Sequence, residues 1–520
     1  MKENIDLNNI SGGSIAEFSN ALEFPVQVVR FLKAIIVLFC FAIVVIPELP
    51  KEFFIAFHPI SHKPYIFSRS HIFATEFYLF WAFIGFFSIA LPIRISIVGV
   101  ILSLSFIPIS LPHGAKFFLI SEKIKSKFWL LIVAAGFLST CFFYLARTSY
   151  VSNLSFADGA PLSGYISQGI IFPAEVLTCY FFQLLQSFVG IAVPTFKSLD
   201  AIIWANCMAG GFFVVLTLIM VRSSVGGIVN NVLLAVGVIG SGYIVTFFGY
   251  VETTQLELTS MVGFFASAFM ANMQVLLGKK KFWEVIALIF ASLAFMAHAA
   301  GILLLPALIL MLMRDFDGTQ KSFTHGLRSL VTLRNLVLIF VVVLLPYYWL
   351  IGEPFYLHGD FGNASGGADN IMFVPLHLDY ASPPSQDVHY SMFSSWHFFD
   401  ILSTVLLACP FTFPLLISSI YLILRYRIFF TIIEKRLFWI TGSGAFFCML
   451  VPLFWNHDFG MWGDWNIAVT YLFPANLFGW IVFTTILQRF SLVTGRVFQF
   501  LLPMILTQVV LCLGMLWQLY

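Results

Sequence analysis

Apolar and polar positions alternate in long blocks along this chain. Apolar runs are bounded by charged residues, Pro or Gly and are separated by polar gaps. A helix of about 20 apolar residues crosses a bilayer because all its backbone hydrogen bonds are made internally. We therefore predict an all-α, polytopic transmembrane helical bundle of about 13–14 spans. The predicted spans are 28–48, 72–91, 94–111, 128–146, 199–221, 225–247, 257–277, 282–297, 299–313, 332–350, 398–424, 437–455, 466–487 and 497–518.

Composition excludes a soluble domain. The 520 residues are 60% hydrophobic and only 10% charged, whereas a soluble domain has about 25% charged residues. The formal net charge is +2 and no basic tract occurs, so we expect no nucleic-acid partner. The seven cysteines include no CxxC pair, so neither a zinc site nor a disulfide framework is predicted.

The polar gaps form a basic set and an acidic set. From residue 116 onward, one alternate set carries nearly all the lysines and arginines, and the other carries most of the aspartates and glutamates. Lys and Arg mark cytoplasmic loops of membrane proteins. The acidic gaps are therefore predicted to lie on the exoplasmic or periplasmic side of the cell membrane, together with any active site that they form.

The N-terminal part follows a less regular pattern. Lys51, Lys63 and Arg69 predict a cytoplasmic 49–71 gap, which would leave the N-terminus outside. We divide the chain into residues 1–127, a polar tail with extra spans, and residues 128–520, the main transmembrane domain.

Two of the outer gaps, about 147–198 and 351–397, are long. Loops of more than about 15 residues in compact proteins are usually functional or disordered. In the first gap Pro173-Ala174-Glu175 suits a helix start, and apolar residues follow at helical spacing. An amphipathic helix that lies flat in the membrane interface is predicted there.

Three outer positions combine a structural and a chemical interpretation. Asp158-Gly159 suits a turn, but a carboxylate just above the lipid also suits a general base. Glu252 ends a helix, where it either extends toward the polar headgroups or contributes to a site. His298 lies in a tight turn between two apolar runs, and an ionisable group at membrane depth is costly enough to indicate function.

The later outer gaps hold further candidates. His397 and Asp400 share one helical face, which suits either helix capping or the binding of a phosphate or metal. His389 lies just upstream. Asp464 and Trp465 belong to a cluster at 456–466 that suits either interface anchoring or sugar binding. The spacing of these acids and histidines does not match a metal site, so none is predicted.

No nucleotide-binding or hydrolase motif occurs in the chain, so no soluble cofactor is expected, and a transferred group should come from a donor in the membrane. Taken in order, the outer segments resemble the GT-C superfamily of polytopic glycosyltransferases. The resemblance covers about 128–490. It rests on five short motifs, namely Asp158-Gly159, Gly249 to Glu252, His298, His397 to Asp400, and Asp464-Trp465-Asn466. Asn466 stands where the pattern has a second acid, and the spans in 28–111 are additional to the pattern.

The resemblance implies a polyprenyl-phosphate-linked sugar as donor and a glycan, lipid or protein as acceptor, with inversion at the sugar. Asp158 matches the base. Donors to the leaving phosphate would come from the few outer basic groups, Arg147, Lys197, His389 and His397. The remaining substrate-binding candidates are Glu175, Glu252, His298, Asp400, Asp464 and Trp465.

Three alternatives remain. A transporter or flippase of lipid-linked sugars needs polar groups along a path through the bilayer, and the middles of the predicted spans are nearly free of charge. A polysaccharide polymerase or ligase would use an oligosaccharide-lipid donor. An inactive relative of the transferases is the third alternative, because Asn466 replaces an acid.

Overall fold

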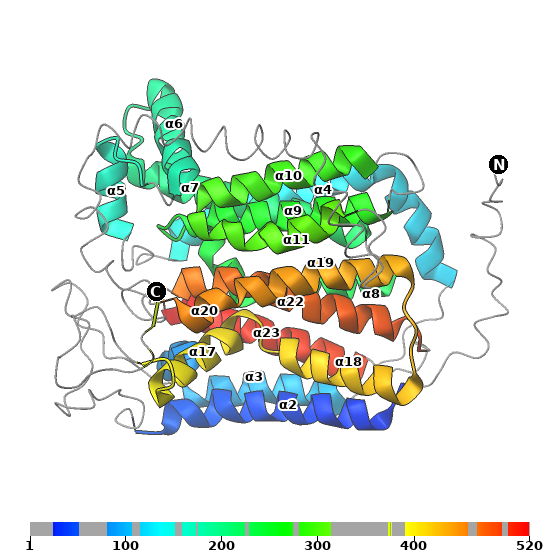
Figure 1. Ribbon diagram of the computed structural model, residues 1–520. Helices are drawn as coiled ribbons and strands as arrows, with labels where there is room; N and C mark the ends of the chain where they lie inside the picture. The colour runs from blue at the N-terminus through cyan, green and yellow to red at the C-terminus, as the bar shows by residue number, and fades with distance from the viewer. Residues whose placement is uncertain are drawn as a thin grey trace, which may run out of the picture.

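The computed structural model is a bundle of roughly parallel and antiparallel helices (Figure 1). It describes residues 24–50, 81–106, 115–150, 159–172, 175–223, 228–273, 280–313, 373–374, 376, 391–455, 465–490 and 498–518. Within these ranges the only β-type pairing is an isolated bridge between Phe373 and Trp455. The predicted all-α class is confirmed.

The described helices follow the predicted apolar runs. They are α2 (Val26–Val45), η2 (Ile46–Glu48), η4 (Trp81–Ser88), α3 (Leu91–Phe106), α4 (Ala115–Tyr150), α5 (Gly159–Ser167), α6 (Val176–Ala192), α7 (Ser198–Arg222), α8 (Ile228–Ile239), η6 (Gly242–Phe247), α9 (Thr254–Met273), α10 (Lys280–Ala297), η8 (Ala299–Leu304), α11 (Leu305–Leu312), α17 (Ser395–Ala408), α18 (Thr412–Tyr426), α19 (Ile432–Cys448), α20 (Leu450–Phe454), α22 (Trp465–Leu487) and α23 (Phe498–Gln518).

Among the described residues, seven helices are long and apolar enough to cross a bilayer. An eighth crossing is added if α17 and α18, which meet at an angle of 80°, count as one bent span. Shorter apolar helices, such as α3 and α11, fill the bundle between them. The protein is therefore a multi-pass membrane protein, as its composition predicted.

Two helices form the centre of the bundle because other helices surround them. α22 and α9 are 89% and 83% buried over their apolar windows. Small residues allow the closest approaches: a side chain at Gly263 of α9 would overlap Phe290 of α10, and one at Gly211 of α7 would overlap Thr140 of α4. Close backbone approach at small residues is a main source of helix association in membranes.

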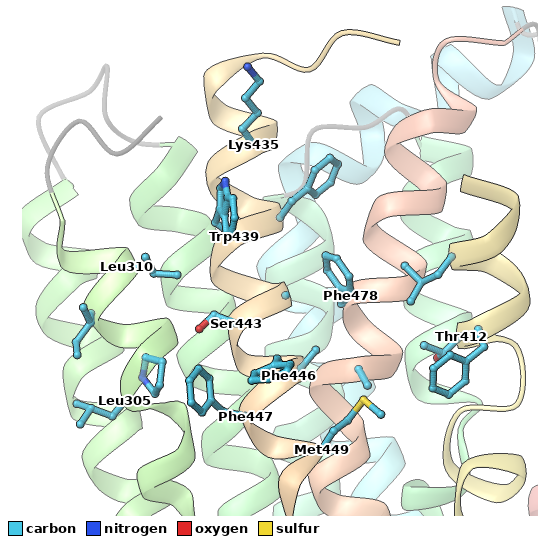
Figure 2. Close-up of a pocket in the computed structure, with 18 residues that line it drawn as sticks. Leu305, Leu310, Thr412, Lys435, Trp439, Ser443, Phe446, Phe447, Met449 and Phe478 are labelled. Atoms are coloured by element: carbon cyan, nitrogen blue, oxygen red, sulfur yellow. The ribbon is translucent and has the colours of Figure 1, made fainter. Parts of the chain in front are cut away.

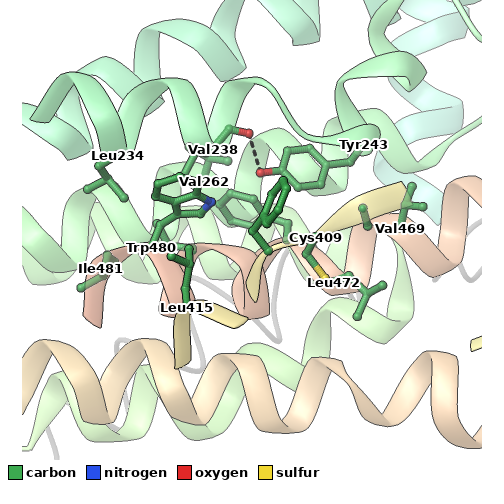
Figure 3. Close-up of a cluster of buried hydrophobic side chains, with 14 of the residues drawn as sticks. Leu234, Val238, Tyr243, Val262, Cys409, Leu415, Val469, Leu472, Trp480 and Ile481 are labelled. Atoms are coloured by element: carbon green, nitrogen blue, oxygen red, sulfur yellow. Dashed lines mark hydrogen bonds between the residues drawn. The ribbon is translucent and has the colours of Figure 1, made fainter. Parts of the chain in front are cut away.

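The interior also contains a break in a helix. α8 ends at Ile239, so carbonyl groups of its last turn lose their helical partners. Side chains replace them: Tyr243 donates a 2.6 Å hydrogen bond to the Val238 carbonyl beside the Trp480 ring (Figure 3). The Gly237 carbonyl accepts hydrogen bonds from Asn476 at 3.2 Å and from Gln508 at 2.8 Å.

One face of α6 is buried and the other is exposed, and both are apolar. Val176, Cys179 and Phe182 are buried, whereas Phe188 and Ile191 are 74% and 84% exposed. Figure 1 shows α6 running across the direction of the bundle helices, at one end of the bundle that we call the α6 end. This orientation agrees with the predicted interfacial helix.

The direction of α2 corrects a prediction. Near the start of α2, Lys33 donates a hydrogen bond to Gln499 at the start of α23, and Phe24 stacks on Phe500 with ring centroids 5.5 Å apart. The start of α2 therefore lies opposite the α6 end, on the side of the basic gaps. The end of α2 therefore lies at the α6 end, whereas the charges of the 49–71 gap predicted it on the side of the basic gaps. Residues 51–71 themselves lie outside the described part of the chain.

The packing of α3 against α2 bears on the predicted span 72–91. Arg94, near the start of α3, donates a 2.9 Å hydrogen bond to the Val44 carbonyl and pairs with Glu48, so α2 ends where α3 begins. Phe106, at the other end of α3, lies under the Lys33 ammonium group. α2 and α3 are therefore an antiparallel pair. Residues 72–80 of the predicted span 72–91 lie outside the described part of the chain, and the described part contains the short helix η4.

Candidate functional site

Four polar side chains from four helical segments meet at the α6 end. Glu175 occupies the N-cap position of α6, Glu257 lies in the first turn of α9, His298 is the N-cap of η8, and Tyr471 lies early in α22. We call these four residues the outer polar cluster. The sequence predicted Glu175 and His298 as site residues, and the fold brings them together.

Tyr471 connects the cluster. Its hydroxyl oxygen lies 2.5 Å from Glu257 Oε1 and 2.9 Å from His298 Nδ1. On the other side of the imidazole ring, His298 Nε2 lies 3.9 Å from Glu175 Oε1. The Glu257 Oε2 atom lies 3.8 Å from His298 Nδ1. The contacts therefore run in one line from Glu257 through Tyr471 and His298 to Glu175.

The backbone around His298 explains why its side chain is held there. His298 has an extended backbone conformation between α10 and η8, and its Nδ1 atom accepts a 3.3 Å hydrogen bond from the Ala300 amide. Gly301 contacts the Ala294 backbone so closely that a side chain would overlap it. Thr178 of α6 donates to the Ala297 carbonyl at 3.0 Å, which ties α6 to the same turn.

Burial keeps the imidazole neutral. Desolvation lowers the pKa of His298 to about 4, because the charged form loses water in the bundle interior. The contacts with Glu175 and Glu257 would be ion pairs only with a protonated ring, so at neutral pH they are contacts of a neutral imidazole. The exposed fraction of the side chain increases along the line, from 0% at Glu257 to 19% at Glu175.

Glu252 lies close to this region in the chain, immediately before α9. It is buried, and its carbonyl group accepts a 2.9 Å hydrogen bond from Asn206 of α7. The preceding turn contains Gly249 in the left-handed region, with φ of 72°. A side chain at Gly249 would meet the Arg147 side chain of α4 at 3.1 Å. Arg147 and the segment from Gly249 to Glu252 are therefore neighbours.

His397 and Asp400 lie on α17, and both are buried. Their predicted placement on one helix is confirmed, and the helix cap is supplied by Ser394, whose hydroxyl accepts from the His397 amide at 3.2 Å. His397 Nε2 lies 2.9 Å from the Leu453 carbonyl at the end of α20. This contact orients the ring toward α20, on a different set of helices from the outer polar cluster.

Several predicted residues lie outside the described part of the chain. They are Asp158, His389 and Asp464, and the side chain of Trp465 belongs with them. α5 begins at Gly159, directly after Asp158, and its Ser163 contacts Ser198 at the start of α7 at 3.2 Å. Lys197 is exposed at the N-cap position of α7.

Two residues of the cluster were missed in the sequence. Glu257 is a carboxylate inside an apolar helix. An ionisable group at membrane depth costs free energy, so such a residue is a candidate functional residue. Tyr471 has no distinguishing signal, because tyrosines are common in apolar helices and its role depends on partners from α9 and η8. Within the described ranges, no three His, Cys, Asp or Glu residues are placed to share a metal ion.

A separate apolar cavity of about 1080 Å³ lies between α11, α18, α19 and α22 (Figure 2). Its lining is almost entirely aliphatic and aromatic, with Lys435 at one end and Leu305 and Met449 toward the other. From Lys435 to Met449, α19 rises about 21 Å. A cavity of this length and lining fits a hydrocarbon chain.

Comparison with known proteins leaves the geometry as the basis for function. No family model, curated protein or solved structure matches this chain.

Proposed function

We propose that the protein is a membrane glycosyltransferase that moves a sugar from a polyprenyl-phosphate lipid to a glycan, lipid or protein acceptor. The reaction takes place on the exoplasmic or periplasmic face. The acceptor oxygen forms a bond to the sugar, the bond from the sugar to the lipid phosphate breaks, and the configuration at the sugar inverts. Asp158 takes the proton of the acceptor hydroxyl.

The outer polar cluster carries this proposal. Glu175, Glu257, His298 and Tyr471 come from distant parts of the chain and gather at one end of the bundle, beside the interfacial helix α6. Polar groups concentrated at one membrane surface suit a reaction with a lipid headgroup. Carboxylates and imidazoles there supply hydrogen bonds to sugar hydroxyls and phosphate oxygens.

The apolar cavity supports a lipid-linked donor. Leu305, at the end of the cavity nearer the α6 end, is the first residue of α11 and follows His298 by only the short helix η8. A prenyl chain in the cavity would leave its phosphate toward the α6 end. One side of the protein would then contact both the prenyl chain and the phosphate of the donor.

The test uses full-length protein in lipid nanodiscs and a panel of polyprenyl-phosphate hexoses and pentoses. Asp158→Asn is expected to lower transfer by about 10²–10⁴-fold, the usual contribution of a general base. The matched control is Asp200→Asn, because Asp200 accepts a 2.9 Å hydrogen bond from the Lys197 amide and an asparagine oxygen can replace it. Unchanged transfer by Asp158→Asn would remove the assignment of the base. Transfer from oligosaccharide lipids alone would indicate a polymerase or ligase.

A transporter or flippase is the second candidate, and one observation favours it. The break between α8 and η6 faces the break between α17 and α18, where a side chain at Gly242 would overlap the Leu407 carbonyl. Transporters build ion and substrate sites at such breaks. Here Asn476 and Gln508 already donate to the Gly237 carbonyl. Substrate counterflow in proteoliposomes without a covalent product would favour transport over transfer.

A further inference from the structure

The heavy-atom positions in the outer polar cluster do not fix where its protons lie. The Tyr471 hydroxyl has one proton but lies within hydrogen-bond distance of both Glu257 Oε1 and His298 Nδ1. It can donate to one of them and must accept from the other. The positions of the heavy atoms therefore allow two arrangements of protons.

In the first arrangement Glu257 is ionised. Tyr471 donates to Glu257, and Nδ1–H of His298 donates to the Tyr471 oxygen, which leaves Nε2 with a lone pair facing Glu175. In the second arrangement Glu257 is a neutral carboxyl group that donates to Tyr471. Tyr471 then donates to Nδ1, and Nε2 carries the proton toward Glu175.

Two contacts favour the second arrangement at neutral pH. The Ala300 amide donates to His298 Nδ1 at 3.3 Å, so Nδ1 acts as an acceptor and carries no proton of its own. Glu257 Oε2 is fully buried, and within the described residues it has no hydrogen-bond donor. An ionised carboxylate in that position is costly, whereas a neutral carboxyl group is much less so.

We propose that Glu257, Tyr471 and His298 form a proton relay whose outlet is Glu175. Four O–H or N–H bonds break and four form when the relay releases its proton through one bridging water. The Glu257 O–H proton moves to Tyr471, and the Tyr471 proton moves to His298 Nδ1. The Nε2 proton moves to a water molecule, which passes one of its own protons to Glu175, because the 3.9 Å between Nε2 and Glu175 Oε1 is too long for a direct hydrogen bond. One proton passes from a buried carboxyl group to a partly exposed one, and no imidazolium persists.

The relay has its outlet at the rim of the cluster. The Glu175 side chain is 19% exposed, whereas those of Glu257 and Tyr471 are fully buried. Other titratable groups facing these residues are Cys448 of α19, which interacts with Glu257 and Tyr471, and Cys179 of α6, which interacts with Glu175. Neither thiol lies in the line of hydrogen bonds, so both act on the relay only through their electrostatic field.

Transfer of a sugar is not assumed in this inference, which depends only on the four side chains. In the proposed transferase, the relay would keep a proton available beside the lipid phosphate. The two proposals can therefore be refuted independently. If the relay is refuted, Asp158 is still the proposed base, and if the transferase assignment is refuted, the proposed proton relay is unaffected.

The test follows both ends of the relay in full-length protein in nanodiscs. Infrared spectroscopy detects the neutral carboxyl group of Glu257 by a C=O band that Glu257→Gln removes. The control Glu284→Gln should keep this band, because Glu284 pairs with Lys280 on α10 at 3.6 Å, far along that helix from His298. Nitrogen NMR of ¹⁵N-histidine protein reports which ring nitrogen carries the proton, and His298→Gln identifies the signal.

As the pH is raised from neutral, the carboxyl band should disappear and the proton of His298 should move from Nε2 to Nδ1 at one shared midpoint. In Tyr471→Phe, which removes only the hydroxyl group, the His298 proton should no longer follow Glu257. The two midpoints should separate by more than about one pH unit, since coupling is lost. The relay is excluded if the wild-type band and ring proton change independently or do not change, or if they stay coupled in Tyr471→Phe.

Discussion

His298 should make the protein unstable in mild acid, and the size of the effect follows from its burial. Burial lowers the pKa of His298 to about 4 in the folded protein, against an ordinary value of 6.5. The unfolded chain therefore binds a proton at this site before the folded protein does, so stability falls as pH drops from about 6.5 toward 4. At pH 5 the expected loss relative to pH 8 is about 2 kcal/mol, and its limit well below pH 4 is about 3 kcal/mol.

The measurement compares the wild type with His298→Gln in lipid bicelles, with the free energy of unfolding determined by steric trapping at pH 8 and pH 5. Carboxylates and histidines outside the outer polar cluster titrate alike in both proteins, so the difference between the two pH profiles isolates His298 and its partners in the cluster. The glutamine variant should be the less stable protein at pH 8, because it loses the ring contacts with Tyr471. Its deficit should shrink by about 2 kcal/mol at pH 5. Parallel pH profiles for the two proteins would refute the burial argument.

Three further changes probe other parts of the bundle. Arg489→Met removes two 2.8 Å hydrogen bonds to the buried Glu434 carboxylate. The free energy of unfolding should fall by about 1–3 kcal/mol, less than for a fully buried pair, because Arg489 is partly exposed. Arg489→Lys should recover part of this loss in the same assay. Asn476→Leu leaves the Gly237 carbonyl with two side-chain donors, Ser241 and Gln508, instead of three. It also removes the 3.0 Å contact of the amide with the Tyr243 hydroxyl. The loss in unfolding free energy should be about 1–3 kcal/mol, whereas no loss would show that water replaces the amide. Ser443→Phe, in the wall of the apolar cavity, should raise KM for long-chain polyprenyl donors and leave short-chain donors unaffected; an equal effect on both would place the lipid chain elsewhere.

The sequence predicted the helices well but their connections less well. Apolar runs such as 199–221 and 466–487 match α7 and α22 closely, because a backbone in lipid must satisfy its own hydrogen bonds. The segment 72–91 was predicted as a crossing from its apolar composition, yet η4 lies where α2 ends and α3 begins. An apolar run indicates that its side chains are removed from water. It does not indicate whether they contact lipid or other parts of the protein.

The candidate site shows the same division. Glu175 and His298 were found because charged or ionisable groups near apolar helices are rare enough to be noticed in sequence. Tyr471 was not found, since its importance arises from a 2.5 Å contact with Glu257 that no local pattern encodes. Asp158, the predicted base, lies outside the described residues, so its role remains a matter for the transfer assay.

The sequence alone determined that this chain is a helical membrane protein whose acidic and basic gaps alternate, because lipid imposes helix formation and membrane electrostatics sort lysine and arginine. Only the tertiary structure decided the direction of α2, the breaks in α8 and α17–α18, and the line of contacts from Glu257 to Glu175. These features depend on which helices are neighbours. Neighbours are chosen by the fit of small and large side chains over the whole bundle, and a pattern read along one helix does not contain that fit.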